Sequence, residues 1–214
     1  MQKVLLSVAA AAALSFASFS ASAVTQQGWF IGVNGGSSHY SVSHTSFDDN
    51  NDSAFGAVAG YRWVVDRPFS LGVEAGYVDL GSMKATDDES FTGYSDLYKA
   101  KFKGQALLIG ANGKWDLPHG FTITARAGLA HSRVKYTVTE YLSPSVPGYT
   151  PYYSNNDSND NGVYGGLGFG YDFNENVGIT LTYDHYALKA DDITGDKRTV
   201  NVGVFGAAVE YRFW

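Results

Sequence analysis

The sequence predicts an all-β protein, an eight-stranded antiparallel up-and-down transmembrane β-barrel. Eight segments alternate apolar residues with small or polar ones at a period of two, which is typical of strands. The chain contains 25 Gly and 15 Tyr, as suits a narrow barrel with small residues inside and aromatic residues at the membrane interfaces. The apolar faces are strongly aromatic and the opposite faces carry Gly and charge, which favours lipid outside and a polar lumen over a soluble sandwich.

The N-terminus predicts export from the cytoplasm. Met1-Gln2-Lys3 supplies a positive start, Val4 to Phe19 is apolar and rich in Ala, and Ala21-Ser22-Ala23 has the A-x-A form of a cleavage site. A transmembrane anchor is the alternative, but the stretch is rich in Ala and Ser and no charged stop follows it. We therefore expect a signal peptide over residues 1–23 and the barrel over residues 24–214.

The composition narrows the function classes. No second apolar run is long enough for a transmembrane helix. The chain has no Cys, which excludes disulfides and thiol chemistry. A net charge of −6 argues against nucleic acid as a partner. We expect a monomer without a cofactor or a metal site.

Successive residues of each segment point to opposite faces, so that Trp29, Ile31 and Val33 face lipid while Phe30 and Gly32 face the lumen. The expected strands are Trp29–Asn34, Phe55–Trp63, Phe69–Tyr77, Ala106–Trp115, Phe121–Leu129, Gly166–Phe173, Val177–Asp184 and Phe205–Phe213. Four apolar residues break the alternation, namely Leu108, Val200, Val202 and Val204. A bulge or a partly apolar upper lumen would explain them.

The links between segments alternate in length. Tight turns are expected at 66–68, 116–120 and 174–176, and long loops at Ser41 to Asn51, Lys84 to Leu97, Glu140 to Asn161 and Ala190 to Asp196. This is the layout of an outer-membrane barrel with both termini in the periplasm. An aromatic girdle is expected near the turns, made of Trp29, Trp63, Phe69, Trp115, Phe121, Phe173 and Phe213.

Several segments resemble the OmpA-like transmembrane domain family. "AFGAVAGYRWVVDRPFSLGVEAGYVDLG" (Ala54 to Gly81) is similar to the family's second and third strands, "FTITARAGLAHS" to its fifth, and "AAVEYRFW" to its closing strand. The chain stops at the end of the barrel, so the periplasmic peptidoglycan-binding domain of the full-length family is expected to be absent. Trp214 follows the closing aromatic Phe213, where the family usually ends on the aromatic.

The lumen is expected to hold an ion network. Four inward cations and four inward carboxylates balance, and an unpaired charge in a narrow barrel would be costly. They are Arg62, Lys114, Arg126 and Arg212, with Glu74, Asp172, Asp184 and Glu210. Glu74 and Arg126 lie equally far from their turns and are expected to meet, and the resemblance implies the same pair. The family's partner cation on the seventh strand is Thr180 here, which favours a structural plug over a gate.

A second set of cations is expected to face outward on neighbouring strands. Setting Trp115 opposite Phe121 places Lys103 opposite Arg133, and Lys101 opposite Lys135. Opposed like charges are destabilising unless an anion joins them. These residues are expected roughly 30 Å above the turn, the level of lipopolysaccharide phosphates in an outer membrane. Arg and Lys bind phosphate well, so we expect lipopolysaccharide contact; a cationic extension solvated above the membrane is the alternative.

Catalysis and calcium binding are not expected. His131 and Ser132 are adjacent and therefore point to opposite faces, which does not suit a lipid A deacylase. Asp157-x-Asn159-x-Asn161-Gly162 matches half of an EF-hand loop, but the closing Glu position is Gly168. The long loops are polar, acidic and rich in Tyr, which suits a host or phage ligand without identifying one.

The function expected from the sequence is that of a small structural outer-membrane barrel that contacts lipopolysaccharide and holds loops at the surface of a Gram-negative cell. Alternatives are an adhesin, a weak porin-like ion channel and, least favoured, a lipid A-modifying enzyme. The closing strand, with Tyr211, Phe213 and Trp214, resembles the signal that the outer-membrane insertion machinery recognises.

Overall fold

The computed structural model describes residues 25–41, 51–91, 94–143, 150, 152–191 and 197–214. The predicted signal peptide lies outside these residues, as do the central parts of the predicted loops Ser41 to Asn51 and Ala190 to Asp196. Among the described residues, no helix is long and apolar enough to cross a membrane.

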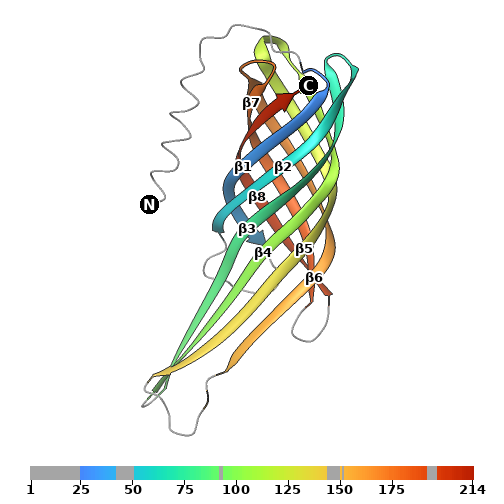
Figure 1. Ribbon diagram of the computed structural model, residues 1–214. Coiled ribbons are helices and arrows are strands. Elements are labelled where there is room, and N and C mark those ends of the chain that lie inside the picture. Colours follow the sequence, from blue (N-terminus) through green and yellow to red (C-terminus); the bar gives the residue numbers. More distant parts are fainter. Residues whose placement is uncertain (1–24, 42–50, 92–93, 144–149, 151, 192–196) are drawn as a thin grey trace.

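Eight antiparallel strands close into one barrel, in which each strand pairs with its neighbours in sequence and β8 pairs with β1 (Figure 1). The strands are β1 (Gly28–Ser41), β2 (Asn51–Asp66), β3 (Phe69–Phe91), β4 (Tyr94–Asp116), β5 (Phe121–Ser143), β6 (Tyr153–Asp172), β7 (Val177–Asp191) and β8 (Lys197–Phe213). The predicted fold class is confirmed. The three tight turns are also present, and the one between β4 and β5 contains a short 3₁₀ segment, Pro118–Gly120.

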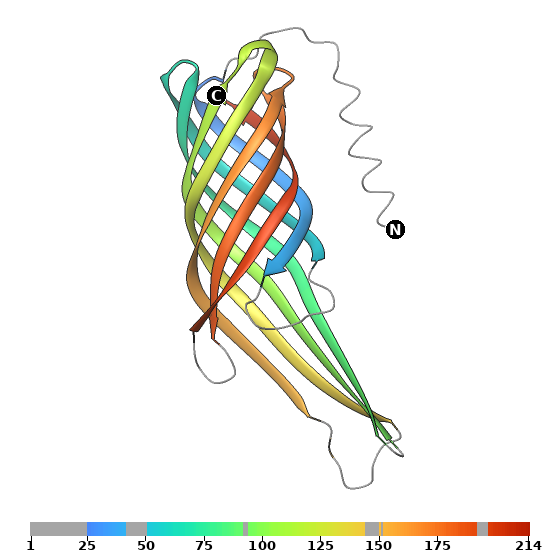
Figure 2. The same ribbon diagram turned by 180° about the vertical axis from the view of Figure 1, so that it is seen from behind.

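The strands differ greatly in length. β3, β4 and β5 have 23 residues each and β6 has 20, whereas β1 has 14 and β7 has 15. The long strands continue past the end of the other four (Figures 1 and 2). We call this four-stranded extension, formed by residues 82–91, 94–103, 133–143 and 153–161, the blade. It lies at the end of the barrel away from the short turns.

The blade corrects two loop predictions. Residues 84–91 belong to β3 and residues 94–97 to β4, with Lys84 paired with Lys101 and Phe91 with Tyr94. Most described residues between Glu140 and Asn161 belong to β5 or β6, with Thr139 opposite Tyr153. Their Asn, Asp and Ser content is typical of turns, but the ladder with β5 holds this segment extended.

Gly81 marks the junction between barrel and blade. It has a positive φ of 76° at the bulge between Asp79 and Ser82, where β3 leaves β2 and continues with β4 alone. A Cβ at this position would lie 2.7 Å from the carbonyl oxygen of Ser53, so the bulge requires glycine. Asp52 closes it by accepting a 2.7 Å hydrogen bond from the backbone amide of Ser82.

The upper lumen, on the blade side, is apolar. Buried side chains from several strands pack there into one cluster: Tyr40, Ala54, Val78, Leu80, Ala106, Leu108, Ala130, Tyr164, Tyr186, Leu188, Val202 and Val204, with Val200 partly buried beside them. Leu108, Val202 and Val204 therefore keep the alternation and point inward. Of the two explanations for the broken pattern, the partly apolar lumen is correct.

The outer wall carries the expected apolar band. Large apolar side chains are exposed all round it, and aromatic residues gather at the end with the short turns. Trp29, Trp63, Trp115, Phe121 and Phe213 are exposed there, while Phe69 and Phe173 are half-buried. Trp29 packs edge-on against Tyr61 with ring centroids 5.3 Å apart. A rim of this kind suits the headgroup region of a bilayer.

Candidate functional site

The lumen near the short turns holds five charged side chains in contact. Both guanidinium NH groups of Arg62 donate to Glu210, at 2.9 and 3.1 Å. Asp172 accepts from Lys114 and from Arg212, each at 2.7 Å. All three cations and Asp172 are buried. Charge-assisted bonds of this length are strong and directional, so the lower cluster ties β2, β4, β6 and β8 together across the lumen.

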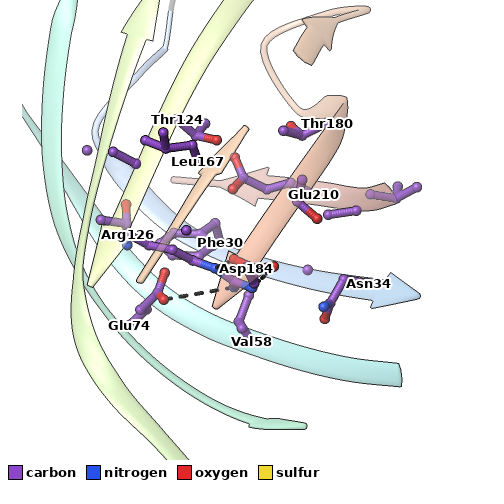
Figure 3. Close-up of a pocket in the computed structure, with 18 of the residues that line it drawn as sticks. Phe30, Asn34, Val58, Glu74, Thr124, Arg126, Leu167, Thr180, Asp184 and Glu210 are labelled. Carbon is purple, nitrogen blue, oxygen red and sulfur yellow. Dashed lines mark hydrogen bonds and ion pairs between the residues drawn. The ribbon is translucent and has the colours of Figure 1, made fainter. Parts of the chain in front are cut away.

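A second cluster lies further up the lumen. Arg126 donates to both carboxylate oxygens of Asp184, at 2.7 and 2.6 Å (Figure 3). Glu74 lies 4.0 Å from the Arg126 guanidinium and accepts a 2.7 Å hydrogen bond from the hydroxyl of Tyr164. The predicted contact between Glu74 and Arg126 is therefore present only at the limit of an ion pair, and Asp184 is the closer partner. The upper cluster therefore consists of Glu74, Arg126, Asp184 and Tyr164. The sequence analysis did not predict the contacts that Asp184 and Tyr164 make in it.

The structure thus divides the eight predicted lumen charges between two groups. The lower cluster has three cations and two carboxylates, a surplus of one positive charge, and the upper has one cation and two carboxylates, a surplus of one negative charge. A cavity of about 80 Å³ separates them, and Thr180 lies in its wall (Figure 3). The surplus positive charge of the lower cluster and the surplus negative charge of the upper cluster cancel each other. The two clusters therefore depend on each other for charge balance in the lumen.

Above both clusters, the apolar group described above fills the lumen. Leu80, Tyr186 and Val202 are fully buried within it. Apolar side chains give a permeating ion nothing to replace its hydration shell, so this layer is unfavourable for ions.

The predicted outward cations lie on one face of the blade, beside the apolar wall of the barrel. Lys101, Lys135 and Arg133 are exposed and Lys103 is half-exposed. Lys99, which the sequence analysis did not single out, extends the row and lies 5.3 Å above the ring of Tyr141. We call these five residues the cationic face.

The register predicted for these cations is wrong by two residues. Trp115 pairs with Ile123, so Lys103 lies opposite Lys135, Gln105 opposite Arg133 and Lys101 opposite Thr137. The turn is wider than assumed, because the Leu117 amide donates to the Phe121 carbonyl oxygen at 2.7 Å and the 3₁₀ segment lies between them. Between β4 and β5, the directly opposed pair of like charges is Lys103 with Lys135.

Two carboxylates partly neutralise the cationic face. Lys103 contacts Asp79 at 2.9 Å and Arg133 contacts Asp157 at 2.5 Å. The hydrogen bond from Arg133 lowers the pKa of Asp157, and the one to Asp79 raises the pKa of Lys103, so both pairs stay ionised near neutral pH. Among the described residues, Lys101 and Lys135 have no carboxylate within ion-pair distance. Asp79 and Asp157 both lie at outward-facing positions of their strands, so the alternation along the sequence could have identified them as partners of these cations.

The residues weighed for other chemistry are also placed. His131 is exposed on the outer wall, whereas Ser132 is buried and its hydroxyl donates to the Asp160 carbonyl oxygen at 3.0 Å. The prediction that they point to opposite faces is confirmed. Asp157, Asn159 and Asn161 alternate with other residues along β6 instead of curving into a loop. Among the described residues, no three His, Asp or Glu side chains are grouped to hold a metal ion.

The predicted assembly signal lies at the seam that closes the barrel. Phe213 pairs with Trp29 and Tyr211 with Ile31 across β8 and β1. Tyr211 and Phe213 are exposed on the outer wall with their rings stacked 6.2 Å apart, and Trp214 is exposed at the end of the chain. They are therefore accessible to a partner that approaches from the lipid side.

A closed barrel with an apolar wall, an aromatic rim and internal ion pairs defines a membrane-spanning β-barrel. The family model described as the outer membrane protein beta-barrel domain matches residues 8–213. The chain belongs to this family and is a protein of the cell outer membrane.

Solved structures of this fold come from several Gram-negative bacteria. Neisserial surface protein A is 17% identical with a TM-score of 0.54, and the match covers 86% of this chain and 97% of that one. Ail, the attachment invasion locus protein of Yersinia pestis, solved with the heparin analogue sucrose octasulfate, is 17% identical with a TM-score of 0.50, covering 88% and 100%. At this identity the likeness concerns the fold. No curated protein matches the chain.

Proposed function

We propose that this barrel anchors the blade at the cell surface and binds lipopolysaccharide phosphates through the cationic face. The observation that carries the proposal is the surplus of positive charge just above the apolar band. Among the residues whose side chains the structure describes, the five cations of the cationic face have two carboxylate partners, which leaves a surplus of three positive charges. A surface of this kind attracts anions from outside the chain.

The height of the cationic face fits lipid phosphates. The outward apolar residues of β4 end at Leu107, which is 59% exposed. Lys103 follows four residues further along the same face, which at ~3.3 Å per residue and a tilt of ~40° is roughly 10 Å above it. In outer-membrane barrels the short turns face the periplasm, so this rim faces the outer leaflet and its phosphates.

The chemistry also fits phosphate. Lys103 and Lys135 are opposed across β4 and β5, and a phosphate between them replaces repulsion with two charge-assisted contacts. Arg133 adds a planar group suited to two oxygens of one phosphate. The complementary groups therefore occupy one rigid sheet and need little ordering on binding.

The test compares wild type with the change of Lys101, Lys103, Arg133 and Lys135 to Gln. We expect lipopolysaccharide to raise the unfolding temperature of wild type, added salt to shrink that gain, and the quadruple variant to lose most of it. Arg67→Gln is the matched control, because Arg67 is an exposed cation at the turn end. An equal gain in wild type and the quadruple variant would contradict the proposal.

Attachment to a host or phage ligand is the second candidate. The observation that favours it is the set of exposed aromatic residues on the blade, where Tyr141, Tyr152 and Tyr153 are each more than half exposed. Ail, which shares the fold, is named for attachment and invasion. Changing Tyr141, Tyr152 and Tyr153 together to Ser tests this function, since loss of cell or phage binding with the barrel intact would support it and unchanged binding would contradict it.

A further inference from the structure

A groove lies on the outer wall on the side of the ring opposite the cationic face. It has a volume of about 340 Å³ and lies over β7, β8 and β1; its central strand, β8, is four strands from β4 and three from β5 in the closed ring. Its lining residues are Ser37, His39, Ser41, Tyr183, His185, Asn201, Gly203 and Phe205. It contains no Lys, Arg, Asp or Glu, so it is chemically distinct from the cationic face.

The strand register builds this groove. Gly203 lies directly opposite His39 on one side and His185 on the other, so two imidazoles flank a position without a side chain. The hydroxyl of Tyr183 lies 3.1 Å from where a Cβ of Gly203 would be. Gly203 therefore forms the floor of the groove, and the neighbouring side chains form its walls.

The groove is graded from apolar to polar. At its lower end, Phe205 and Tyr183 form a cross-strand pair and both are more than half exposed. At its upper end, Asn201 pairs with Ser41. The distance from Phe205 to Asn201 is four residues of strand, about 13 Å. This order, from aromatic through imidazole to amide and hydroxyl, is the order of environments that a lipid meets from its chains to its head.

The hydrogen-bonding groups suit a neutral ligand. Nδ1 of His39 lies 2.8 Å from Oδ1 of Asn51. Because this amide oxygen only accepts, the His39 Nδ1–H donates to it and Nε2 is left as an acceptor. Asn201, Ser37 and Ser41 add donors and acceptors without charge. Hydroxyl groups pair with such a set, and a sugar ring packs its C–H face on an aromatic side chain.

We propose that this groove binds a neutral pyranose ring of an outer-leaflet glycolipid, with the acyl chains running down the apolar wall below Phe205. The position of the groove on the outer wall indicates that its ligand is a lipid. Phe205 is eight residues from Phe213 along β8, roughly 20 Å of height at ~3.3 Å per residue and a tilt of ~40°, so the groove begins near the top of the ~25 Å apolar band. The inference does not depend on phosphate binding at the cationic face.

The probe is dodecyl maltoside, a neutral pyranose head on a single chain, titrated into the folded protein in dodecylphosphocholine micelles. We expect saturable amide shifts at Ser41, Asn201 and Gly203, and nuclear Overhauser contacts from sugar ring protons to the rings of His39 and His185. Gly203→Leu fills the floor and should weaken this binding by about tenfold or more. It is expected to fold, because the atoms nearest to a Cβ at this position belong to the end of the flexible Tyr183 side chain.

Two further variants keep the test decisive. Ala111→Leu adds the same bulk at an exposed outward position on β4 and should leave binding unchanged. His39→Ala with His185→Ala removes two exposed side chains, so it serves if Gly203→Leu does not fold. Unchanged binding in the folded groove variants, or the same contacts from phosphocholine heads, would overturn the proposal. Saturation of the two imidazoles by Zn²⁺ at micromolar concentration, with no response to the sugar, would overturn it in favour of a metal site.

Discussion

In the closed barrel, Arg126 donates to both oxygens of Asp184, and Lys114 and Arg212 share Asp172. On the blade, Lys101 and Lys135 have no carboxylate within ion-pair distance among the described residues. The two regions belong to the same strands and differ in what balances their charge. The barrel interior balances its own charge, which stabilises it. The described part of the blade leaves a surplus of positive charge, and the proposed binding of phosphate rests on that surplus.

The largest effect is expected at the seam between β8 and β1, because a change there affects insertion and folding of the whole barrel. We propose that the insertion machinery recognises the exposed aromatic end of β8. Changing Tyr211 and Phe213 to Ala should lower the folded, heat-modifiable fraction in cells several-fold. Gel mobility of unheated membrane samples measures this fraction. If insertion is unchanged, the signal lies elsewhere, for instance in Trp214.

The next effect is expected in the upper cluster. Asp184→Ala leaves the half-buried Arg126 with the 4.0 Å contact to Glu74 as its nearest carboxylate; breaking a fully buried pair costs about 3–5 kcal/mol, and a loss at the lower end of that range is expected here. Glu74→Ala removes that weaker contact and the Tyr164 hydrogen bond, for about 1–3 kcal/mol. Urea unfolding in lipid vesicles gives both values.

A double-mutant cycle extends this prediction. Adding Arg126→Leu to Asp184→Ala should recover part of the loss, because it removes the uncompensated charge. If the losses in unfolding free energy of the two single variants simply add in the double variant, Asp184 and Arg126 do not interact. The claim that internal ion pairs stabilise the barrel would then fail for this pair.

A smaller effect is expected at the junction. Gly81→Ala forces a side chain into a left-handed conformation and against the Ser53 carbonyl, for about 1–3 kcal/mol. Gly165→Ala is the matched control, because its Cβ would meet only the Arg126 carbonyl oxygen at 3.7 Å. Equal unfolding free energies for the two variants would show that the bulge does not constrain the junction.

The sequence was sufficient for the barrel and insufficient for the blade. Alternate residues of a strand point to opposite faces, and a closed barrel has only an inner and an outer face. The alternation along each strand is therefore enough to place Phe30, Arg62 and Asp184 inside. The sequence predicts loops for the outer parts of the blade, at Lys84 to Leu97 and Glu140 to Asn161, because these segments are polar and acidic. The alternation of "RVKYTVTEY" (Arg133 to Tyr141) continues the period and was the signal that could have revealed it.

The partners inside the lumen were harder to predict, because they depend on distances across the barrel. Glu74 and Arg126 were matched by their height above the turns, but Asp184 lies on β7, and its partner follows from how far each side chain reaches across the lumen. The register of β4 and β5 depended on a turn whose 3₁₀ segment adds two residues to the connection. Neither distance is encoded in a local pattern.

The smallest effect is expected at the exposed pair of Arg133 and Asp157. Because Arg133 lowers the Asp157 pKa, the pair contributes stability above the ordinary Asp pKa of about 3.9, and loses it as the pH falls through the lowered value. Wild type should exceed Asp157→Asn slightly in unfolding temperature at pH 7 and match it at pH 2. A difference that grows on acidification would contradict this assignment.

The measurement that tests the central claim most directly compares lipopolysaccharide with the same lipopolysaccharide after enzymatic dephosphorylation. The added lipid is identical except for its phosphates, so the rise in unfolding temperature of the wild-type barrel isolates their contribution. We predict that the dephosphorylated form loses most of that rise and that the remaining rise does not respond to salt. An equal rise with both forms would show that the surplus charge of the blade serves something other than lipid phosphate.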